Sequence, residues 1–211
     1  MELLEKSGLK TLVGKVNMDR NAPDYLCEAS AEKSLEDTES WIKASERFTG
    51  TKPILTPRFI PSCTDELMAG LGELSKKYDL PVQSHLSENP LEIEWVRKLC
   101  PESSSYGDAY DRFGLMNHKT VMAHCVHMTE EEIKLMKDKG VFAAHCPESN
   151  MNIASGIAPA AMMLNEGIHI GLGSDVAGGT TLWLPRAMTL AVQCSKMYWR
   201  YMDQKLAPLN L

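Results

Sequence analysis

Residues 119–146 have the sequence KTVMAHCVHMTEEEIKLMKDKGVFAAHC, in which two short apolar runs lie on either side of a charged segment. The runs Thr120–Ala123 and Val141–Ala144 are too short for helices and are typical of buried strands. Two strands that run in the same direction need a crossover connection, which is usually a helix. The stretch therefore predicts a parallel strand–helix–strand unit, and this unit decides the fold.

The charged segment between the two strands carries start and stop signals for a helix. Thr129 and Glu132 have the spacing of a capping box, in which the two side chains satisfy free backbone amides at a helix start. The segment Glu130–Lys139 would form the helix. Gly140 follows it and is suited to the left-handed conformation with which many helices end.

The same alternation of strand and helix continues through the rest of the chain, and repeated units of this kind predict an α/β fold with a parallel sheet. We expect six strands, at Thr11–Val16, Pro53–Thr56, Pro81–Ser84, Thr120–Ala123, Val141–Ala144 and Ile168–Gly173. The other helices are expected at Ala31–Phe48, Asp65–Tyr78, Pro90–Leu99, Pro159–Glu166 and Leu182–Met202.

Composition narrows the classes of function. The 211 residues are 44% hydrophobic, enough for one sizeable core, and the net charge of −6 argues against binding to nucleic acid or anionic membranes. The chain has no apolar run long enough for a membrane span and no signal-peptide pattern at its start, so we expect a cytoplasmic protein. The six cysteines form no Cys-x-x-Cys pair, which argues against disulfides and a thiolate zinc site.

Ionisable side chains follow the predicted strands: Arg58, His85, His124, His145 and Asp175 each close or directly follow one. The carboxyl ends of parallel strands meet on one face, so these residues should come together there. A single histidine in such a place is more often a satisfied packing residue than a ligand. Three histidines and an aspartate favour a catalytic zinc site, because imidazole and carboxylate are suited to zinc. Hydrolysis of a small polar compound is the expected chemistry.

Two further features stand beside this predicted site. Glu88 lies three residues after His85 and is our candidate general acid/base, although a glutamate in the first turn of the next helix would also be favoured by the helix dipole. Gly178 and Gly179 follow Asp175, and they are either turn residues or positions where the backbone closely approaches a ligand. The sequence leaves both choices open.

Five segments together resemble the guanine deaminases of the amidohydrolase superfamily. They are Thr56–Phe59 (TPRF), Gln83–Asn89 (QSHLSEN), Met122–Cys125 (MAHC), His145–Asn150 (HCPESN) and Gly173–Gly179 (GSDVAGG). The resemblance implies a partial TIM-like (β/α) barrel of the metal-dependent hydrolase type, with about six of the eight strands present. It also implies hydrolytic deamination of guanine to xanthine and ammonia, with Zn²⁺ as cofactor.

The resemblance assigns a role to each site residue. His85 and Asp175 would bind zinc and border the substrate, and Asp175 would help to deprotonate the attacking water. Glu88, also in contact with substrate, would carry a proton from water to the purine ring, and His124 would hydrogen-bond the water or the substrate. Arg58 would donate to the guanine carbonyl oxygen and Phe59 would pack on the ring. The segment with His145, Cys146, Ser149 and Asn150 would form a loop that shapes the pocket without a chemical step.

One departure from the family pattern affects the metal site. The family's site begins with a His-x-His pair on the first strand, and this sequence contains no such pair. We therefore expect residues 1–211 to be an incomplete barrel domain that lacks the first two strands and an accessory sheet domain. We expect that the isolated chain is inactive, and that its first and last strands have unpaired edges. The resemblance also implies a homodimer of the full-length protein.

Two other functions are compatible with the sequence. One is a zinc amidohydrolase for another heterocycle, of adenosine, triazine or chlorohydrolase type, which a substrate panel would distinguish. The other is a non-catalytic remnant, which would bind no zinc specifically.

Overall fold

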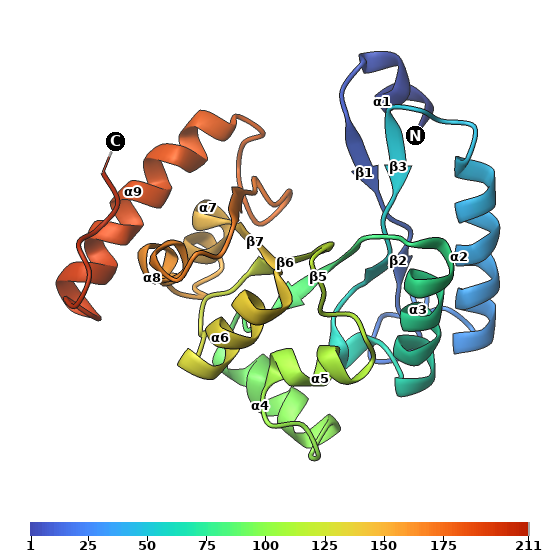
Figure 1. The fold of residues 1–211 in the computed structure, drawn as a ribbon, viewed down its shortest axis with the longest axis horizontal. Helices are drawn as coiled ribbons and strands as arrows, with labels where there is room; N and C mark the ends of the chain where they lie inside the picture. Colours follow the sequence, from blue (N-terminus) through green and yellow to red (C-terminus); the bar gives the residue numbers. More distant parts are fainter. Residues whose placement is uncertain (211) are drawn as a thin grey trace. The chain divides into compact units, whose positions relative to one another are not determined.

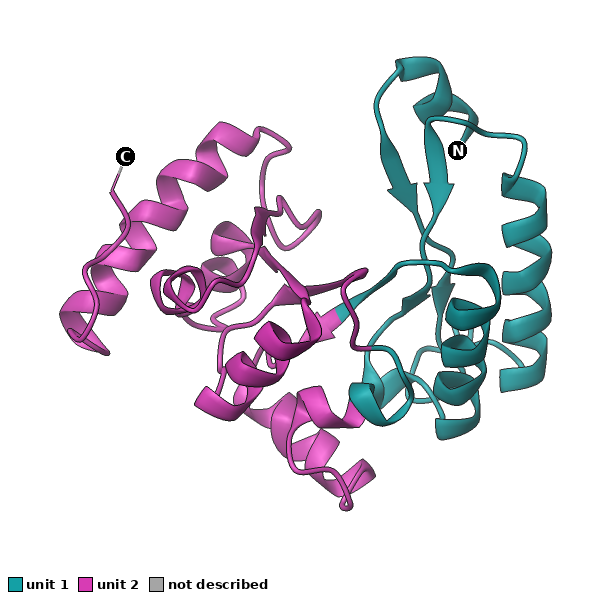
Figure 2. Ribbon diagram, in the orientation of Figure 1, with its two compact units in different colours: residues 1–84, 110–115 teal, residues 85–109, 116–211 magenta. Residues whose placement is uncertain are grey.

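The structure, a computed structural model, describes residues 1–210, which form two compact units (Figure 1). Figure 2 shows the first unit in teal, with residues 1–84 and 110–115, and the second in magenta, with residues 85–109 and the chain from Met116 onward. The strand pairings in both units are parallel, as predicted for an α/β fold. None of the helices among the described residues is long and apolar enough to cross a membrane.

The first unit has short parallel strands covered by two long helices. In chain order its elements are α1 (Glu2–Ser7), β1 (Thr11–Val13), β2 (Val16–Asn17), α2 (Ala31–Ser45), β3 (Thr51–Pro53), β4 (Thr56–Pro57), the 3₁₀ helix η1 (Ile60–Ser62) and α3 (Asp65–Tyr78). β1 pairs with β3 and β2 pairs with β4, both in parallel.

The prediction of one continuous strand at 11–16 was wrong, because the chain is interrupted between β1 and β2. At the interruption Gly14 approaches Thr56 so closely that an added Cβ would lie 1.7 Å from the Thr56 hydroxyl. The prediction of one strand at 53–56 was wrong in the same way, since Ile54 and Leu55 separate β3 from β4. A glycine inside a strand pattern often marks such an irregularity.

Local sequence explains the position of α3, which was predicted with its observed bounds. The Thr64 side chain accepts a hydrogen bond from the Leu67 amide at the helix start, and Asp79 ends the helix in the left-handed conformation, with φ 53°. Leu67, Met68 and Leu71 are fully buried on the face that packs into the unit. Their spacing is that of the apolar face of an amphipathic helix.

The second unit carries the remaining strands and most of the remaining helices. Its elements are the end of β5 (Val82–Leu86), α4 (Pro90–Leu99), the start of α5 (Tyr106–Arg112), β6 (Thr120–His124), α6 (Glu130–Lys139), β7 (Phe142–His145), α7 (Pro147–Asn152), α8 (Ala160–Asn165), β8 (Ile170–Leu172) and α9 (Leu184–Tyr201). The sheet order is β5-β6-β7-β8.

Register in this sheet places the strand ends together. Ala123 of β6 pairs with Ala144 of β7, and His145 of β7 pairs with Leu172 of β8. At the neighbouring edge the Cys125 amide donates to the Leu86 carbonyl at 3.1 Å. The carboxyl ends of four consecutive strands therefore lie along one edge of the unit, where ligands bind in folds of this kind.

The helix α6, which connects the two strands of the unit that decides the fold, forms as predicted. In α6 the Thr129 side chain accepts from the Glu132 amide, the Glu132 carboxylate accepts from the Thr129 amide, and Gly140 ends the helix with φ 70°. In α4 the Asn89 side chain caps the start, followed by Pro90 at the first helical position. The helices α1, η1, α5 and α7 were not predicted, and all four have seven residues or fewer.

Candidate active site

The predicted site residues of the second unit lie at the carboxyl ends of its strands. His85 is the last but one residue of β5, His124 ends β6 and His145 ends β7, while Asp175 lies three residues beyond β8. This position follows from the parallel sheet, because the carboxyl ends of parallel strands all lie at the same edge. The side chains come from four separate βα steps, yet they belong to one compact unit.

His124 is the centre of this group and is 2% exposed. Its Nδ1 lies 2.9 Å from Oδ1 of Asn150, and because an amide oxygen can only accept, Nδ1 carries a proton and donates. Nε2 lies 4.0 Å from Oδ2 of Asp175. The His85 ring stacks on the His124 ring with centroids 5.2 Å apart and an interplanar angle of 21°. Asn150 thus fixes the orientation of an imidazole between His85 and Asp175.

Glu88 approaches the same imidazole from the β5–α4 connection. Its Oε1 lies 3.5 Å from Nδ1 of His124 and accepts a hydrogen bond of 3.0 Å from the Ser155 hydroxyl. Glu88 precedes the N-cap Asn89, and the acidic residue in the first turn of α4 is Glu92. The alternative that Glu88 is a first-turn glutamate was therefore wrong, and its carboxylate faces the site residues.

The backbone beside these side chains is in the left-handed region at four non-glycine residues: Ser87 (φ 48°), His124 (φ 71°), Cys125 (φ 49°) and Asp175 (φ 49°). This conformation costs about 1–3 kcal/mol for each such residue and persists only where surrounding contacts determine it. Three strand ends of one unit share the feature. The local strain therefore accompanies the residues that carry the predicted chemistry.

The donor atoms of the group are suited to a metal ion. A nitrogen of His124, the sulfur of Cys146 and a carboxylate oxygen of Asp175 lie within 4.8 Å of one another. Burial raises the pKa of the Cys146 thiol to about 12, so this sulfur is a neutral thiol and the imidazole and carboxylate are the better donors. His85, the predicted ligand, is not in this cluster, but its ring stacks on that of His124.

His145 is the second buried imidazole of the site. Neither ring nitrogen has a hydrogen-bond partner among the described residues. Burial, and then the nearby charge of His124, lower the pKa of His145 to about 4, so the ring is neutral at pH 7. A neutral imidazole with two unsatisfied nitrogens can serve as a metal ligand or bind a polar group. This observation supports the fit of a metal or a polar ligand to the site.

The segment after His145 was expected to be a loop, and that expectation was wrong. α7 begins at Pro147, whose fixed φ favours the first helical position. The helix buries Ser149 and Asn150, and the Ser149 hydroxyl and the Asn150 Nδ2 have no hydrogen-bond partner among the residues described. Asn150 nevertheless has a definite task, because its Oδ1 orients His124.

The connection after Asp175 is held by its own close contacts. An added Cβ on Gly178 would lie 2.3 Å from the Ser149 hydroxyl and 3.0 Å from Oδ2 of Asp175, and one on Gly179 would lie 1.9 Å from the Ser174 carbonyl oxygen. Both glycines therefore permit close approach to the protein's own atoms. A buried carboxylate, Glu148, accepts hydrogen bonds from Thr180 of the same connection and from Arg186 in the first turn of α9.

Arg58 and Phe59 follow β4 and belong to the first unit. The Arg58 amide donates to the Asn17 carbonyl at 3.1 Å, its side chain is exposed, and Phe59 is half-buried. The Ser84 hydroxyl donates to the Pro57 carbonyl at 2.8 Å and fixes the backbone just before them. The structure thus places the two predicted substrate-binding residues at a strand end, in a different unit from His85, Glu88, His124 and Asp175.

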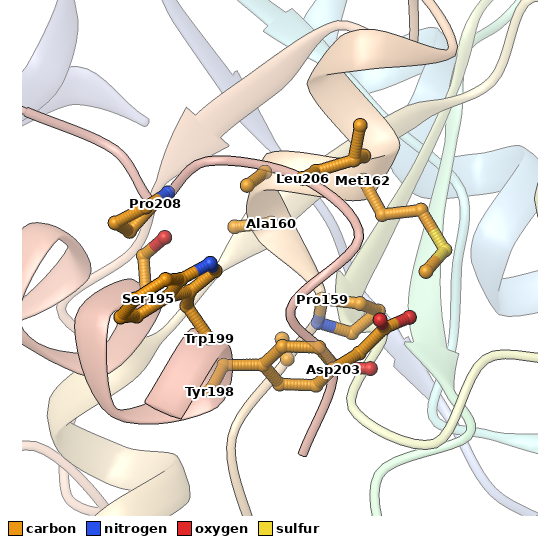
Figure 3. A pocket seen from close by; sticks show the side chains of 11 residues that line it. Pro159, Ala160, Met162, Ser195, Tyr198, Trp199, Asp203, Leu206 and Pro208 are labelled. Atoms are coloured by element: carbon orange, nitrogen blue, oxygen red, sulfur yellow. The ribbon is translucent and has the colours of Figure 1, made fainter. Parts of the chain in front are cut away.

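A cavity elsewhere in the second unit is too small for a substrate. Figure 3 shows that it lies between α8, α9 and the C-terminal segment, lined by apolar side chains such as Met162, Trp199 and Leu206 together with Asp203. Its volume is about 20 Å³, which is room for one water molecule. We place the candidate site at the strand ends because the ionisable side chains converge there.

Sequence reasoning missed two residues that contact the site. Ser155 donates to Glu88, and Nε2 of His127 lies 2.7 Å from the Ser155 carbonyl oxygen. His127 lies in the connection between β6 and α6. The proximity of His127 to His124 in sequence was the one available signal, whereas nothing in the sequence around Ser155 points to Glu88.

The comparisons with known proteins agree on one family. Residues 1–210 match the Amidohydrolase family. The probable guanine deaminase of Schizosaccharomyces pombe is 44% identical over 182 residues, which cover 84% of this chain and 34% of that protein. The guanine deaminase of Dictyostelium discoideum is 42% identical over 200 residues, which cover 94% of this chain and 44% of that protein.

A solved structure is similar over nearly the whole chain. It is guanine deaminase from C. acetobutylicum with guanine bound in the active site, with a TM-score of 0.95 and 49% sequence identity. The similarity covers 99% of this chain and 50% of that chain. The chain therefore spans between a third and a half of the length of these relatives.

Proposed function

The chain belongs to the amidohydrolase family, and on that premise we propose that its protein is a zinc-dependent guanine deaminase. The reaction adds water to the ring carbon that bears the amino group and releases ammonia and xanthine, which is a step of purine catabolism. The convergence of Glu88, His85, His124 and Asp175 at the strand ends of one unit carries the proposal. Guanine as the substrate is supported by three relatives: a probable guanine deaminase, a guanine deaminase, and a third guanine deaminase whose structure holds guanine.

In this proposal Glu88 is the group that moves the proton. Its carboxylate takes a proton from the attacking water and delivers it to the purine ring, so that the amino-bearing carbon can accept the water oxygen. The proton needed for the departing ammonia comes from the same water, whose second proton Asp175 helps to remove. His124, held by Asn150 through Nδ1, presents Nε2 toward Asp175 and can hydrogen-bond the water or the substrate.

Zinc fits the donor set of the site, and we assign His85 and Asp175 to hold it. When bound, zinc lowers the pKa of water toward neutrality and so supplies a nucleophile at neutral pH. Support for the fit comes from the neutral imidazole of His145, whose two nitrogens are unsatisfied, and from the carboxylate of Asp175. The Asn150 hydrogen bond orients His124 in the same group.

We assign recognition of the substrate to Arg58 and Phe59. Arg58 would donate to the guanine carbonyl oxygen, for which its planar fork of donors is suited. Phe59 would pack against the purine ring. Arg58 is exposed and Phe59 is half-buried.

The test of the proposal is ammonia release from guanine by the protein that carries this chain, compared with Glu88→Gln. The substitution removes a proton carrier and preserves shape, so we expect kcat to fall about 10²- to 10⁴-fold while zinc content stays the same. Glu94→Gln is the matched control, because Glu94 is an exposed glutamate of α4. Near-normal turnover of Glu88→Gln at saturating guanine would exclude Glu88 as the proton carrier.

A substrate panel tests the choice of guanine. We expect guanine to be deaminated in preference to adenine, cytosine and aminated triazines. Preference for one of the others would assign the protein to another zinc amidohydrolase, and the absence of both zinc and turnover would favour a non-catalytic remnant.

A further inference from the structure

The carboxylate of Glu88 is held by a residue from a distant part of the second unit. The Ser155 hydroxyl donates to Oε1 of Glu88 at 3.0 Å, and Ser155 is 5% exposed. Oε1 is also the oxygen that lies 3.5 Å from Nδ1 of His124, whereas Oε2 takes part in neither contact. A glutamate has several rotamers of similar energy, and a hydrogen bond from a buried hydroxyl selects one of them. Because Oε1 accepts the hydrogen bond from Ser155, Oε2 is the oxygen that exchanges a proton.

The segment that carries Ser155 is itself fixed by backbone contacts. The Ser155 and Gly156 amides both donate to the Asn150 carbonyl, at 2.8 and 3.3 Å. Ala154 (φ 59°) and Gly156 (φ 129°) flank Ser155 in conformations that are rare for L-residues. A Cβ on Gly156 would lie 3.1 Å from Cγ1 of Val126, so this segment is pressed closely against the β6–α6 connection.

The β6–α6 connection also holds the backbone next to Glu88. The Val126 and His127 amides donate to the Ser87 carbonyl at 3.2 and 2.9 Å, and Ser87 directly precedes Glu88 in the left-handed conformation. The His127 side chain reaches the other way, with Nε2 at 2.7 Å from the Ser155 carbonyl oxygen. One connection therefore fixes both the backbone before Glu88 and the residue that binds its carboxylate.

From this geometry we infer that Ser155 is a positioning residue for Glu88 and that His127 fixes Ser155 for this task. The inference rests on the proposed function, in which Glu88 carries the proton. Ser155 takes part in no bond-making step. It keeps the carboxylate in one orientation, with Oε1 occupied as an acceptor, and proton transfer depends on such alignment within a few tenths of an ångström.

Kinetics of Ser155→Ala in the zinc-loaded protein test the inference. We expect kcat for guanine to fall about 10- to 100-fold, with KM and zinc content unchanged, because the hydroxyl orients a proton carrier and binds neither substrate nor metal. Ser155→Thr keeps the hydroxyl and should recover most of the loss. His127→Ala should give a smaller loss in kcat, which His127→Gln should recover because its side-chain amide can still donate to the Ser155 carbonyl.

A matched control separates positioning from a general loss of stability. Ser195→Ala removes another buried hydroxyl of the second unit, one that accepts from the Leu209 amide and does not contact Glu88. We expect its kcat to be unchanged. An equal loss of kcat in Ser155→Ala and Ser195→Ala, or no loss in Ser155→Ala, would overturn the inference.

The double variant Glu88→Gln/Ser155→Ala tests whether Ser155 acts through Glu88. If Ser155 acts only through Glu88, the second substitution should lower kcat by less than twofold in the Glu88→Gln background. An undiminished further loss would contradict the inference. If Glu88→Gln itself keeps normal turnover, the result refutes the proposed role of Glu88 as the proton carrier rather than its positioning by Ser155.

Crystal structures of the protein and of Ser155→Ala test positioning without turnover. We expect one Glu88 rotamer in the parent and a displaced or multiple rotamer in the variant. A Glu88 side chain that keeps its place without the Ser155 hydroxyl would overturn the inference, whatever the activity.

Discussion

Replacing Glu132 with alanine should destabilise the protein more than the same replacement of either other glutamate in the first turn of α6, Glu130 or Glu131. The Glu132 side chain is 3% exposed, and Oε1 accepts from the Ser87 hydroxyl at 3.2 Å and from the Gly107 amide at 3.1 Å. Its other oxygen, Oε2, accepts from the Thr129 amide at 3.3 Å in the capping box. The carboxylate therefore joins α6, the start of α5 and the side chain of Ser87, the residue before Glu88.

The expected magnitude follows from the donors that the substitution leaves behind. Ser87 and Gly107 are buried, and an unsatisfied buried donor costs about 1–3 kcal/mol. Both contacts are at the long end of the ordinary range, so about 1 kcal/mol each is appropriate. Loss of the Thr129 contact, at an exposed helix start, adds roughly 0.5–1 kcal/mol. We expect Glu132→Ala to lower the free energy of unfolding by about 3 kcal/mol.

Urea unfolding at pH 7, followed by circular dichroism, measures this change. Glu131→Ala is the matched control, because Glu131 is an exposed glutamate in the same turn and has the same favourable interaction with the helix dipole. We expect it to lower stability by less than 0.5 kcal/mol. If the two substitutions have equal effects, the buried contacts of Glu132 contribute nothing and the reasoning is refuted.

Three further predictions concern recognition, pH and the metal site. Arg58→Ala should reduce the preference for guanine over adenine by about 10- to 100-fold at unchanged zinc content, because the guanine carbonyl oxygen loses a charged donor worth about 1.5–3 kcal/mol. Loss of zinc instead would show that Arg58 has a structural role. The folded pKa of His145, about 4, lies below its unfolded value near 6.5, so the stability that the neutral ring contributes is complete above pH 6.5 and is lost as the pH falls toward 4. Urea unfolding from pH 7 to 4 should therefore show a shallower decline in the free energy of unfolding for His145→Asn than for the parent protein. An unchanged decline would contradict the burial argument. Gly178→Ala should displace Asp175 and reduce the bound zinc several-fold in metal analysis, since the added Cβ would lie 3.0 Å from Oδ2 of Asp175. Gly171→Ala is the control and should retain zinc, because its Cβ would meet no atom within 4 Å.

The parts of the fold that could be predicted from the sequence are those determined by local signals. The bounds of α3, α4 and α6 follow from Thr64, Asn89 and the Thr129 capping box, each of which satisfies backbone amides within its own turn. The strands of the second unit were found within two residues, because a buried parallel strand is a short apolar run between helices. The irregularity at Gly14 could not be predicted, since it depends on the approach of Thr56 from another strand.

The site shows the same limit more clearly. His85, His124, His145 and Asp175 could be chosen because each marks a strand end, and parallel topology alone brings strand ends to one edge. Ser155 could not be chosen, because it lies 67 residues from Glu88 and in an irregular segment. Its contact depends on where Asn150 and the β6–α6 connection hold that segment. Residues that we propose for the chemistry can thus be predicted from a strand pattern, whereas the residues that orient them are determined by tertiary packing.

His145 shows how the structure decides a choice that the sequence leaves open. A single histidine at a strand end is more often a packing residue whose nitrogens are satisfied by neighbours, but both nitrogens of His145 are buried without a partner among residues 1–210. Each unsatisfied polar atom costs about 1–3 kcal/mol, and an apolar side chain of similar size would fill the position without that cost. The Ser149 hydroxyl and the Asn150 Nδ2 are unsatisfied in the next turn, and Asn150 already orients His124. A packing role explains a single unsatisfied atom but not several at His145, Ser149 and Asn150, and we infer that these three side chains face a polar ligand.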